Sequence, residues 1–360
     1  MPTSDHPGRD PKKILVVRLG AMGDVIHALP AVDALRQVFP DAKIGWVVEE
    51  RWVELLCSPS SGLCGPTSPQ RPLVEAIHTV NTFRWRANLF ASQTRKEIKE
   101  LKRSLRAENY DAAIDFQGAL KSAVIARWSK AKQIYGFAAP REKIARRFYL
   151  QKVAATGSHV IEQNLSLAQA CTQGKLNMTT AELPHDPIAE NKMQGWLRDD
   201  GISRFALLNP GAGWGAKQWP AERYGHVARE LSTRGISCLI NFGPKEEELA
   251  KLVQRESDGT AQPVRCSITE LIALTRRAAL FIGGDTGPMH LAAALGIPVL
   301  AIFGPTDPAR NGPFGVRNIV LRNAASANSY SHKREADEGL LQISAEEVLA
   351  AAKQLLGSAS

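Results

Sequence analysis

Residues 283–308 read GGDTGPMHLAAALGIPVLAIFGPTDP, and this stretch decides the fold expected of the chain. The apolar run just before it, residues 279–282, predicts a buried strand, and the two glycines let the backbone turn without a Cβ clash. A short helix is expected at once, because Pro288 suits a first helical position. A second apolar run follows the helix. Strand, glycine turn, helix and strand in this order are typical of an α/β domain with a parallel sheet.

The start of this helix is a candidate phosphate site. Asp285, Thr286 and Gly287 lie where unpaired backbone N–H groups face outward, and such a helix N-terminus attracts an anion. His290 falls in the first turn and can reach the same ligand. The alternative for Asp285 is an ordinary helix cap, a common role of aspartate.

The first half of the chain repeats the pattern at its beginning. Residues 13–18, KILVVR, predict a buried strand, and LGAMGD and a helical apolar pattern follow it. Gly20 and Gly23 form G-x-x-G-D instead of the G-x-G-x-x-G of dinucleotide-binding proteins, which disfavours NAD as ligand. Asp24 ends this turn, either as a functional carboxylate or as a helix cap.

Two further glycine turns follow predicted strands of the second half. The turn PGAGWGAKQWP comes after residues 205–209 and contains Gly213 and Lys217, and Glu246 follows the strand at 236–242. Because the carboxyl ends of parallel strands gather at one edge of a sheet, one ligand could touch these turns and the helix at 285–290. Lys217 suits a pyrophosphate and Glu246 a ribose. No Asp-x-Asp is present, so a metal-dependent nucleotide-sugar site is unsupported, and neither a metal nor another cofactor is expected.

The length of 360 residues predicts two domains. Strands and helices alternate in both halves, and the segment PHDPI interrupts them at residues 184–188. The expected division is a disordered lead over 1–12, a Rossmann-like domain over 13–185, a second over 186–340, and a C-terminal helical segment over 341–360 that could pack back on the first domain. The two parallel sheets are expected to face each other across a cleft.

Charge is unevenly distributed along the chain. The formal net charge is +9, yet residues 84–152 alone contain 17 Lys and Arg against 6 Asp and Glu. Such a region indicates an acidic partner, although a solvated helix face is the alternative for any single lysine. Five scattered cysteines without a C-x-x-C pair favour a reducing cytoplasm and no structural zinc. No apolar run is long enough for a membrane span, and the polar N-terminus does not look like a signal peptide.

Several motifs together resemble glycosyltransferase family 9, the bacterial heptosyltransferases, and most of all its lipopolysaccharide heptosyltransferase I branch. They are MGDVIHALPA, GWVVEE, AENYDAAIDFQGALKSA, KQWP, GDTGPMHLAAALGIP and FGPTDP. The resemblance covers residues 13–310 and implies the two-domain GT-B fold. One departure is the turn GAGWGAK, where the branch often has a threonine pair, so phosphate binding is left to backbone N–H groups there.

The resemblance implies transfer of heptose from ADP-L-glycero-D-manno-heptose to a Kdo sugar of Kdo-lipid A, with inversion and without metal. It implies a cytoplasmic enzyme bound peripherally, through charge, to the inner face of the cytoplasmic membrane. Asp24 matches the catalytic base of the family. The matching donor-binding residues are Gly23, Gly213, Lys217, Glu246, Asp285, Thr286, Gly287 and His290, and the residues in acceptor-binding segments are Arg84, Arg86, Lys96 and Arg141.

Two rival hypotheses stay open at this stage. The nearer one is a heptosyltransferase of type II or III, with the same donor and a later core sugar as acceptor. The more distant one is a nucleotide- or RNA-binding protein without enzymatic activity, which only the pI of about 9.4 favours. Aromatic residues make up 6% of the chain and no nucleic-acid motif is present, so nucleic acid is not an expected partner.

Overall fold

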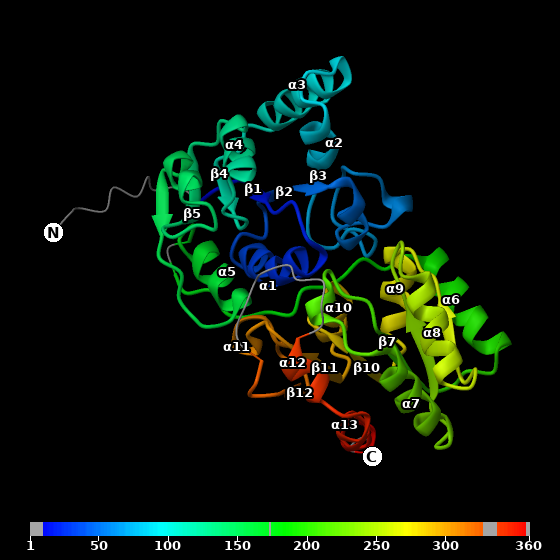
Figure 1. Ribbon diagram of the computed structural model, residues 1–360. Coiled ribbons are helices and arrows are strands. Elements are labelled where there is room, and N and C mark those ends of the chain that lie inside the picture. Colours follow the sequence, from blue (N-terminus) through cyan, green and yellow to red (C-terminus); the bar gives the residue numbers. More distant parts are fainter. Residues whose placement is uncertain (1–9, 173, 327–336, 358–360) are drawn as a thin grey trace. The chain divides into compact units, whose positions relative to one another are not determined.

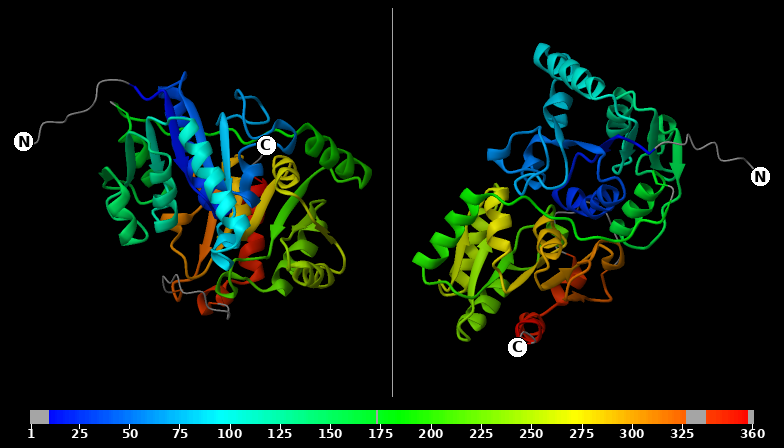
Figure 2. Two further views of the ribbon diagram at one scale, coloured as in Figure 1. Left: turned by 90° about the horizontal axis from the view of Figure 1, so that it is seen from above. Right: turned by 180° about the vertical axis from the view of Figure 1, so that it is seen from behind.

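The computed structural model describes residues 10–172, 174–326 and 337–357. Most of the expected lead over 1–12 lies outside these residues. The chain divides into two compact units, residues 1–184 and 185–360. Each contains a six-stranded sheet in which all neighbouring strands are parallel, with helices on both faces (Figures 1 and 2).

The first unit has the strand order β3-β2-β1-β4-β5-β6. On one face of this sheet, Leu15, Val17 and Val47 form an apolar core with buried side chains of α3 and α4. Helices α1 and α5 pack against each other. The elements are β1 (Lys13–Val17), α1 (Met22–Val38), β2 (Lys43–Glu49), β3 (Ala76–Val80), α2 (Thr82–Ala87), α3 (Ser92–Ala107), β4 (Ala112–Asp115), α4 (Leu120–Trp128), β5 (Gln133–Phe137), β6 (Gln151–Val153) and α5 (Val160–Gln169).

The second unit has the order β12-β11-β10-β7-β8-β9. If β7 is counted as its first strand, this is the same topology as in the first unit. Its elements are α6 (Pro187–Asp199), β7 (Phe205–Asn209), α7 (Ala221–Ser232), β8 (Ser237–Asn241), α8 (Glu247–Glu256), β9 (Ala261–Val264), α9 (Ile268–Thr275), β10 (Leu280–Gly284), α10 (Gly287–Ala294), β11 (Val299–Phe303), α11 (Pro308–Asn311), β12 (Asn318–Arg322), α12 (Glu338–Gln342) and α13 (Ala345–Gly357).

This topology fixes where ligands can bind. In each unit the strand order reverses between the first and the fourth strand, β1 and β4 or β7 and β10. Open parallel sheets bind ligands at the carboxyl ends of the strands beside such a reversal. The segments singled out in the sequence follow β1, β7 and β10.

The C-terminal helix α13 corrects one expectation. Its buried side chains, among them Val348, Ala352 and Leu355, join the core that α7 and strands β10 and β11 build in the second unit. The helix is therefore part of the second unit, whereas residues 341–360 were expected as a segment outside both domains. The physical reason is its apolar stripe, which completes the cover of one face of the second sheet.

Candidate functional site

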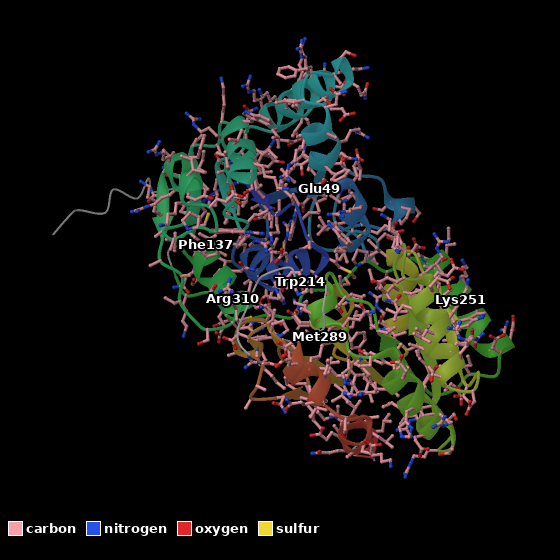
Figure 3. The ribbon with its side chains drawn as sticks, viewed as in Figure 1. Glu49, Phe137, Trp214, Lys251, Met289 and Arg310 are labelled. Carbon is pink, nitrogen blue, oxygen red and sulfur yellow. The ribbon has the colours of Figure 1, made fainter. Side chains whose placement is uncertain are left out.

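The turns after β7 and β10 meet through a compact charged cluster. The Nζ atom of Lys217 lies 2.5 Å from Oδ2 of Asp285, and Nε2 of His290 lies 3.2 Å from Oδ1 of the same carboxylate. Lys217 also lies over the ring of Trp214, with Nζ 4.5 Å from the ring centroid. Figure 3 labels Trp214 and Met289 on the two segments that this cluster joins. The structure thus brings together three of the residues predicted from the sequence.

Asp285 is held in its ionised form at this point. Burial by itself would raise its pKa, but the hydrogen bond and charge of His290 and the charge of Lys217 outweigh it and lower the pKa well below the usual range. The carboxylate therefore fixes the lysine ammonium beside the first turn of α10. An ammonium and a helix N-terminus in one place suit an anionic group such as a pyrophosphate.

Asp285 is not a helix cap, so that alternative is wrong. The N-cap of α10 is Thr286, whose hydroxyl donates to the carbonyl of Gly284 over 3.3 Å instead of capping the helix. Gly287 is the first helical residue. The Asp285 carboxylate is instead engaged by the side chains of Lys217 and His290.

Glu246 lies beside the turn after β7. Its Oε2 accepts a hydrogen bond from the Gly243 N–H over 2.7 Å. A Cβ atom on Gly211 would come within 2.3 Å of Oε1 of Glu246, so only glycine lets the carboxylate approach this turn. Gly213, by contrast, has open space where a side chain would stand, so packing does not require a glycine there.

Two buried asparagines support the same region. Asn241 donates to Oδ1 of Asn209 over 2.6 Å, and Asn209 donates to the Gly211 carbonyl over 3.0 Å. Both stand at the last position of a strand, β8 and β7. Sequence reasoning missed them, although a polar residue that ends an apolar strand was the available signal. They hold the turn that presents Lys217.

The corresponding region of the first unit contains a second ion pair. Nη2 of Arg18 lies 2.5 Å from Oδ1 of Asp24, and the Ala21 N–H donates to Oδ2 over 3.0 Å. The other terminal nitrogen of Arg18 donates to the Phe116 carbonyl, which directly follows β4. Asp24 is the third residue of α1, and Gly23 is buried in the same turn. The alternative of a cap role for Asp24 is therefore partly right, but Arg18, which was not predicted, is the main partner.

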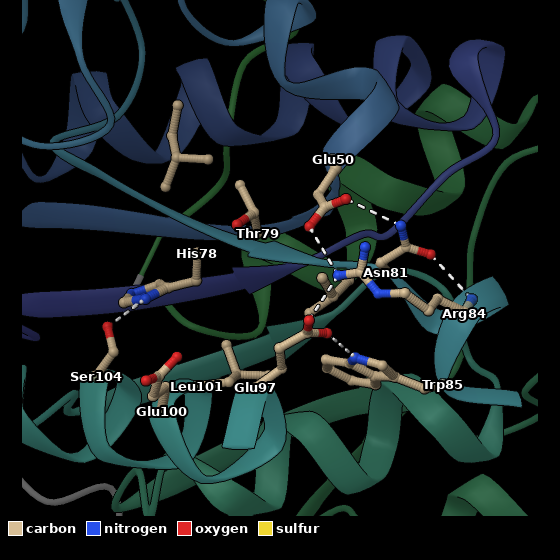
Figure 4. A pocket seen from close by; sticks show the side chains of 12 residues that line it. Glu50, His78, Thr79, Asn81, Arg84, Trp85, Glu97, Glu100, Leu101 and Ser104 are labelled. Carbon is tan, nitrogen blue, oxygen red and sulfur yellow. Dashed lines mark hydrogen bonds and ion pairs between the residues drawn. The ribbon is translucent and has the colours of Figure 1, made fainter. Parts of the chain in front are cut away.

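Arg84 is less free than expected. It lies 2.8 Å from Glu97 and 3.6 Å from Glu50, across a pocket of about 290 Å³ (Figure 4). Hydrogen bonds to these carboxylates raise the pKa of the guanidinium. The pocket belongs wholly to the first unit and also contains His78. Arg84 thus ties α2 to α3 and has only a part of its surface left for an acceptor.

A basic cluster surrounds Lys121 at the beginning of α4. Burial lowers the pKa of Lys121, Glu49 opposes this effect, and the nearby charges of Arg86, Arg51 and Arg141 lower it further. The Nζ atom donates to Oγ1 of Thr82 over 3.0 Å and lies 3.9 Å from Glu49.

Two of the four predicted acceptor residues, Arg86 and Arg141, belong to this basic cluster. Arg86 and Arg141 both act electrostatically on Lys121, whereas no such link to this cluster is found for Lys96, which is exposed on α3. Lys121 and Arg51 were missed because single cations beside a helix or a turn usually form only a solvated surface.

In the part of the chain that the structure describes, no three side chains gather in a way that could hold a metal ion. The five cysteines are free. Within the same residues, no helix has the length and apolarity that crossing a membrane requires.

Comparison with known proteins gives a consistent result. A profile described as Glycosyltransferase family 9 (heptosyltransferase) matches residues 98–341. Lipopolysaccharide heptosyltransferase 1 of Pseudomonas aeruginosa PAO1 is 30% identical over 86% of this chain and 83% of its own length, and that of Escherichia coli K12 is 30% identical over 86% and 93%. The structure of the E. coli heptosyltransferase WaaC with ADP superposes with a TM-score of 0.76 and 28% identity, covering 95% and 99% of the two chains.

These similarities confirm the α/β fold class with two Rossmann-like domains that the GT-B resemblance implied. They also confirm that the protein is an enzyme of the transferase class. The matched profile covers more than half of the chain and includes Lys217, Glu246 and the helix at 287–294. The chain belongs to glycosyltransferase family 9, the heptosyltransferases.

Proposed function

We propose that this protein transfers heptose from ADP-L-glycero-D-manno-heptose to a Kdo residue of Kdo-lipid A in the inner core of lipopolysaccharide. The observation that carries the proposal is the cluster of Lys217, Asp285 and His290 beside the strand reversal of the second unit. This cluster offers one ammonium and one helix N-terminus to a diphosphate. Relatives named lipopolysaccharide heptosyltransferase 1 support the choice of donor and acceptor.

The donor is bound by the second unit in this proposal. The pyrophosphate lies against the first turn of α10, where Thr286 and Gly287 present backbone N–H groups, and near the Lys217 ammonium and Gly213. Glu246 accepts hydrogen bonds from the ribose. When the bond between the heptose and ADP breaks, negative charge grows on the diphosphate, and a preorganised cation and dipole stabilise it without a metal.

Inversion requires one displacement, in which the acceptor hydroxyl attacks an oxocarbenium-like centre from the face opposite ADP. Asp24 takes the proton of this hydroxyl as general base. Arg18 fixes one oxygen of Asp24, and the Ala21 N–H fixes the other, so the carboxylate has a defined orientation. A carboxylate suffices as base once the leaving bond has stretched, because the attacking hydroxyl then becomes more acidic.

The acceptor is recognised by charge. Kdo carboxylates and lipid A phosphates are anionic, and the guanidinium groups of Arg51, Arg86 and Arg141 near Lys121 are suited to such oxygens. Arg84 and Lys96 contribute at the periphery of this region. An acceptor of this kind is held at the inner face of the cytoplasmic membrane, to which the basic first unit would bind peripherally.

The second candidate is a heptosyltransferase that acts on a later core sugar. The turn GAGWGAK, which lacks the threonine pair of the first branch, favours this alternative. The purified enzyme should be incubated with ADP-heptose and either de-acylated Kdo-lipid A or an acceptor that ends in heptose, and ADP release measured. Release with the Kdo acceptor supports the main proposal, release only with the heptose acceptor supports the alternative, and release with neither contradicts both.

A further inference from the structure

Helix α2 and the turn that links it to α3 expose an unusual set of apolar side chains. Phe83 is 85% exposed, Leu89 57% and Phe90 78%. Single exposed apolar residues are ordinary on protein surfaces, but three large ones within eight positions are unusual and point to an interaction site. In Figure 1 this segment lies at the periphery of the first unit.

The exposure is built into the local structure. Trp85, between Phe83 and Leu89, is buried, and its indole N–H donates to Oε2 of Glu97 over 2.7 Å. Thr94 is also buried, and its hydroxyl donates to the Asn88 carbonyl over 2.9 Å. These two contacts fix α2 and the turn before α3. The three apolar side chains therefore cannot turn inward without breaking them.

Positive charge adjoins the apolar patch. Arg86, Arg95, Lys96 and Lys99 are exposed on α2 and on the first turns of α3. The opposite side of α3 is anchored, since Leu101 and Leu105 are buried in the core of the first unit. The helix thus presents its basic side outward while the domain holds it in place.

We propose that Phe83, Leu89, Phe90 and these four cations form a docking surface, the α2–α3 surface, for a membrane that contains anionic phospholipids. The apolar side chains enter the boundary between headgroups and acyl chains, and the cations meet the phosphates. This inference rests on the proposed function, because an acceptor carried by lipid A keeps the enzyme at such a surface. It identifies the segment that contacts the membrane, and it adds an apolar contribution to the membrane binding that charge alone would provide.

Charge complementarity favours lipid over the other possible occupants. A second copy of this chain would bring the same four cations opposite one another, and like charges repel. A nucleic acid would bind the cations with its phosphates and could stack its bases on Phe83 and Phe90, but the aliphatic side chain of Leu89 offers no ring for stacking. An anionic membrane interface accommodates both the aromatic and the aliphatic side chains together with the cations.

The test is flotation of the full-length protein with vesicles of phosphatidylcholine, either alone or mixed with phosphatidylglycerol. Wild type should float with the mixed vesicles and much less with phosphatidylcholine alone. The triple variant Phe83→Ser/Leu89→Ser/Phe90→Ser should lose at least about tenfold in partitioning, because the apolar contact is removed. Arg95→Gln/Lys99→Gln should weaken binding and reduce its salt dependence.

Ile188→Ser is the matched control, because Ile188 is 72% exposed on the second unit and lies outside the α2–α3 surface. It should partition like wild type. Thermal melting of the triple variant should match wild type, since only exposed side chains change. Equal vesicle binding by wild type and the triple variant overturns the proposal, as does a change in oligomeric state or RNA binding without a change in vesicle binding.

Transfer to a soluble, de-acylated acceptor separates this inference from the proposed function. The triple variant should keep this activity and lose only activity on acceptor embedded in vesicles. If wild type binds vesicles through the α2–α3 surface but transfers no heptose to any acceptor, the proposed function fails and the docking surface stands. If the triple variant acts on vesicle-borne acceptor as wild type does, the docking surface fails.

Discussion

Arg18 and Asp24 form an ion pair in which the terminal nitrogen Nη2 lies 2.5 Å from Oδ1, at the end of β1 and the start of α1. Arg18 is buried, whereas Asp24 is partly exposed. The arginine therefore depends on the aspartate for its counter-charge, while one side of the carboxylate remains accessible. A single carboxylate thus has a structural role toward the protein and an available surface for a substrate.

Replacing Asp24 by Asn should abolish most turnover and also reduce stability. Loss of a positioned general base lowers kcat by about 10² to 10⁴-fold. The melting temperature should fall as well, because the buried Arg18 guanidinium loses its counter-charge. Steady-state kinetics, melting curves and calorimetry with ADP would measure the three effects, and ADP affinity should not change.

The double variant Arg18→Met/Asp24→Asn separates the two roles. It should regain part of the melting temperature, since no buried charge is left unpaired, and remain inactive. If Asp24→Asn alone keeps more than about a tenth of kcat, the assignment of Asp24 as base is wrong.

Replacing Lys217 by Met should weaken binding of ADP-heptose. Loss of a charged hydrogen bond to the diphosphate costs about 1.5 to 3 kcal/mol of binding free energy. Calorimetry should show this loss in Lys217→Met and none in Lys251→Met, which removes an exposed lysine that pairs with Glu247 and Glu248 on α8. Equal donor affinity in both variants would falsify the assignment of Lys217.

The two arginines of α2 should respond differently to substitution. Arg86→Gln should raise the acceptor KM and flatten its salt dependence, because Arg86 adds to the positive field around Lys121. Arg84→Gln should mainly lower the melting temperature, since it breaks the contacts with Glu50 and Glu97. Kinetics at several salt concentrations and melting curves test this pair, and an unchanged KM in Arg86→Gln would remove that residue from the acceptor region.

Stability should decrease as the pH falls from 6.5 toward 4, and His78 should cause part of this decrease. Burial lowers the pKa of His78 from 6.5 to about 4, and its ring nitrogens lie 2.8 Å from the Tyr110 hydroxyl and 2.9 Å from the Ser104 hydroxyl. The unfolded chain therefore takes up a proton on His78 at a higher pH than the folded chain does. The resulting loss in the free energy of unfolding reaches about 3 kcal/mol at pH 4.

Urea unfolding of wild type and His78→Gln at a series of pH values would test this. His78→Gln changes the free energy of unfolding at every pH. The quantity to compare is therefore the slope of this free energy against pH between 6.5 and 4. A shallower slope is expected in His78→Gln, and identical slopes would show that His78 does not titrate in this window.

The central strands could be predicted from the sequence, but most edge strands could not. Strands expected at residues 13–18 and 205–209 agree with the central strands β1 and β7, because strands buried on both faces are continuous apolar runs. By contrast, β6 reads QKV and is largely exposed, β12 is only half-buried, and β9 contains Pro263. Strands with one free edge need no apolar run, so their sequences carry a weak signal.

The candidate site was also only partly predictable from the sequence. Lys217, Asp285 and His290 were predictable because each follows a strand in a glycine-bearing turn, and parallel strands bring such turns together. Their mutual contacts were not predictable, and Asp285 turned out to be a partner of Lys217 instead of a cap. Arg18 was read only as the end of a strand, since its partner Asp24 was assigned to substrate. Pairing between side chains depends on the backbone geometry of the turns, which the residue types do not specify.

The packing of α13 has a consequence for the order in which the chain folds during synthesis. The core of the second unit combines Ala206 on β7 with Val348 and Leu355 on α13, which are made almost 150 residues later. The core that α3 and α4 build in the first unit is made of residues before 184, so this unit can fold before the second is complete. Until α13 emerges, α7 covers only part of one apolar face of the second sheet, and the exposed remainder is prone to aggregation during that interval.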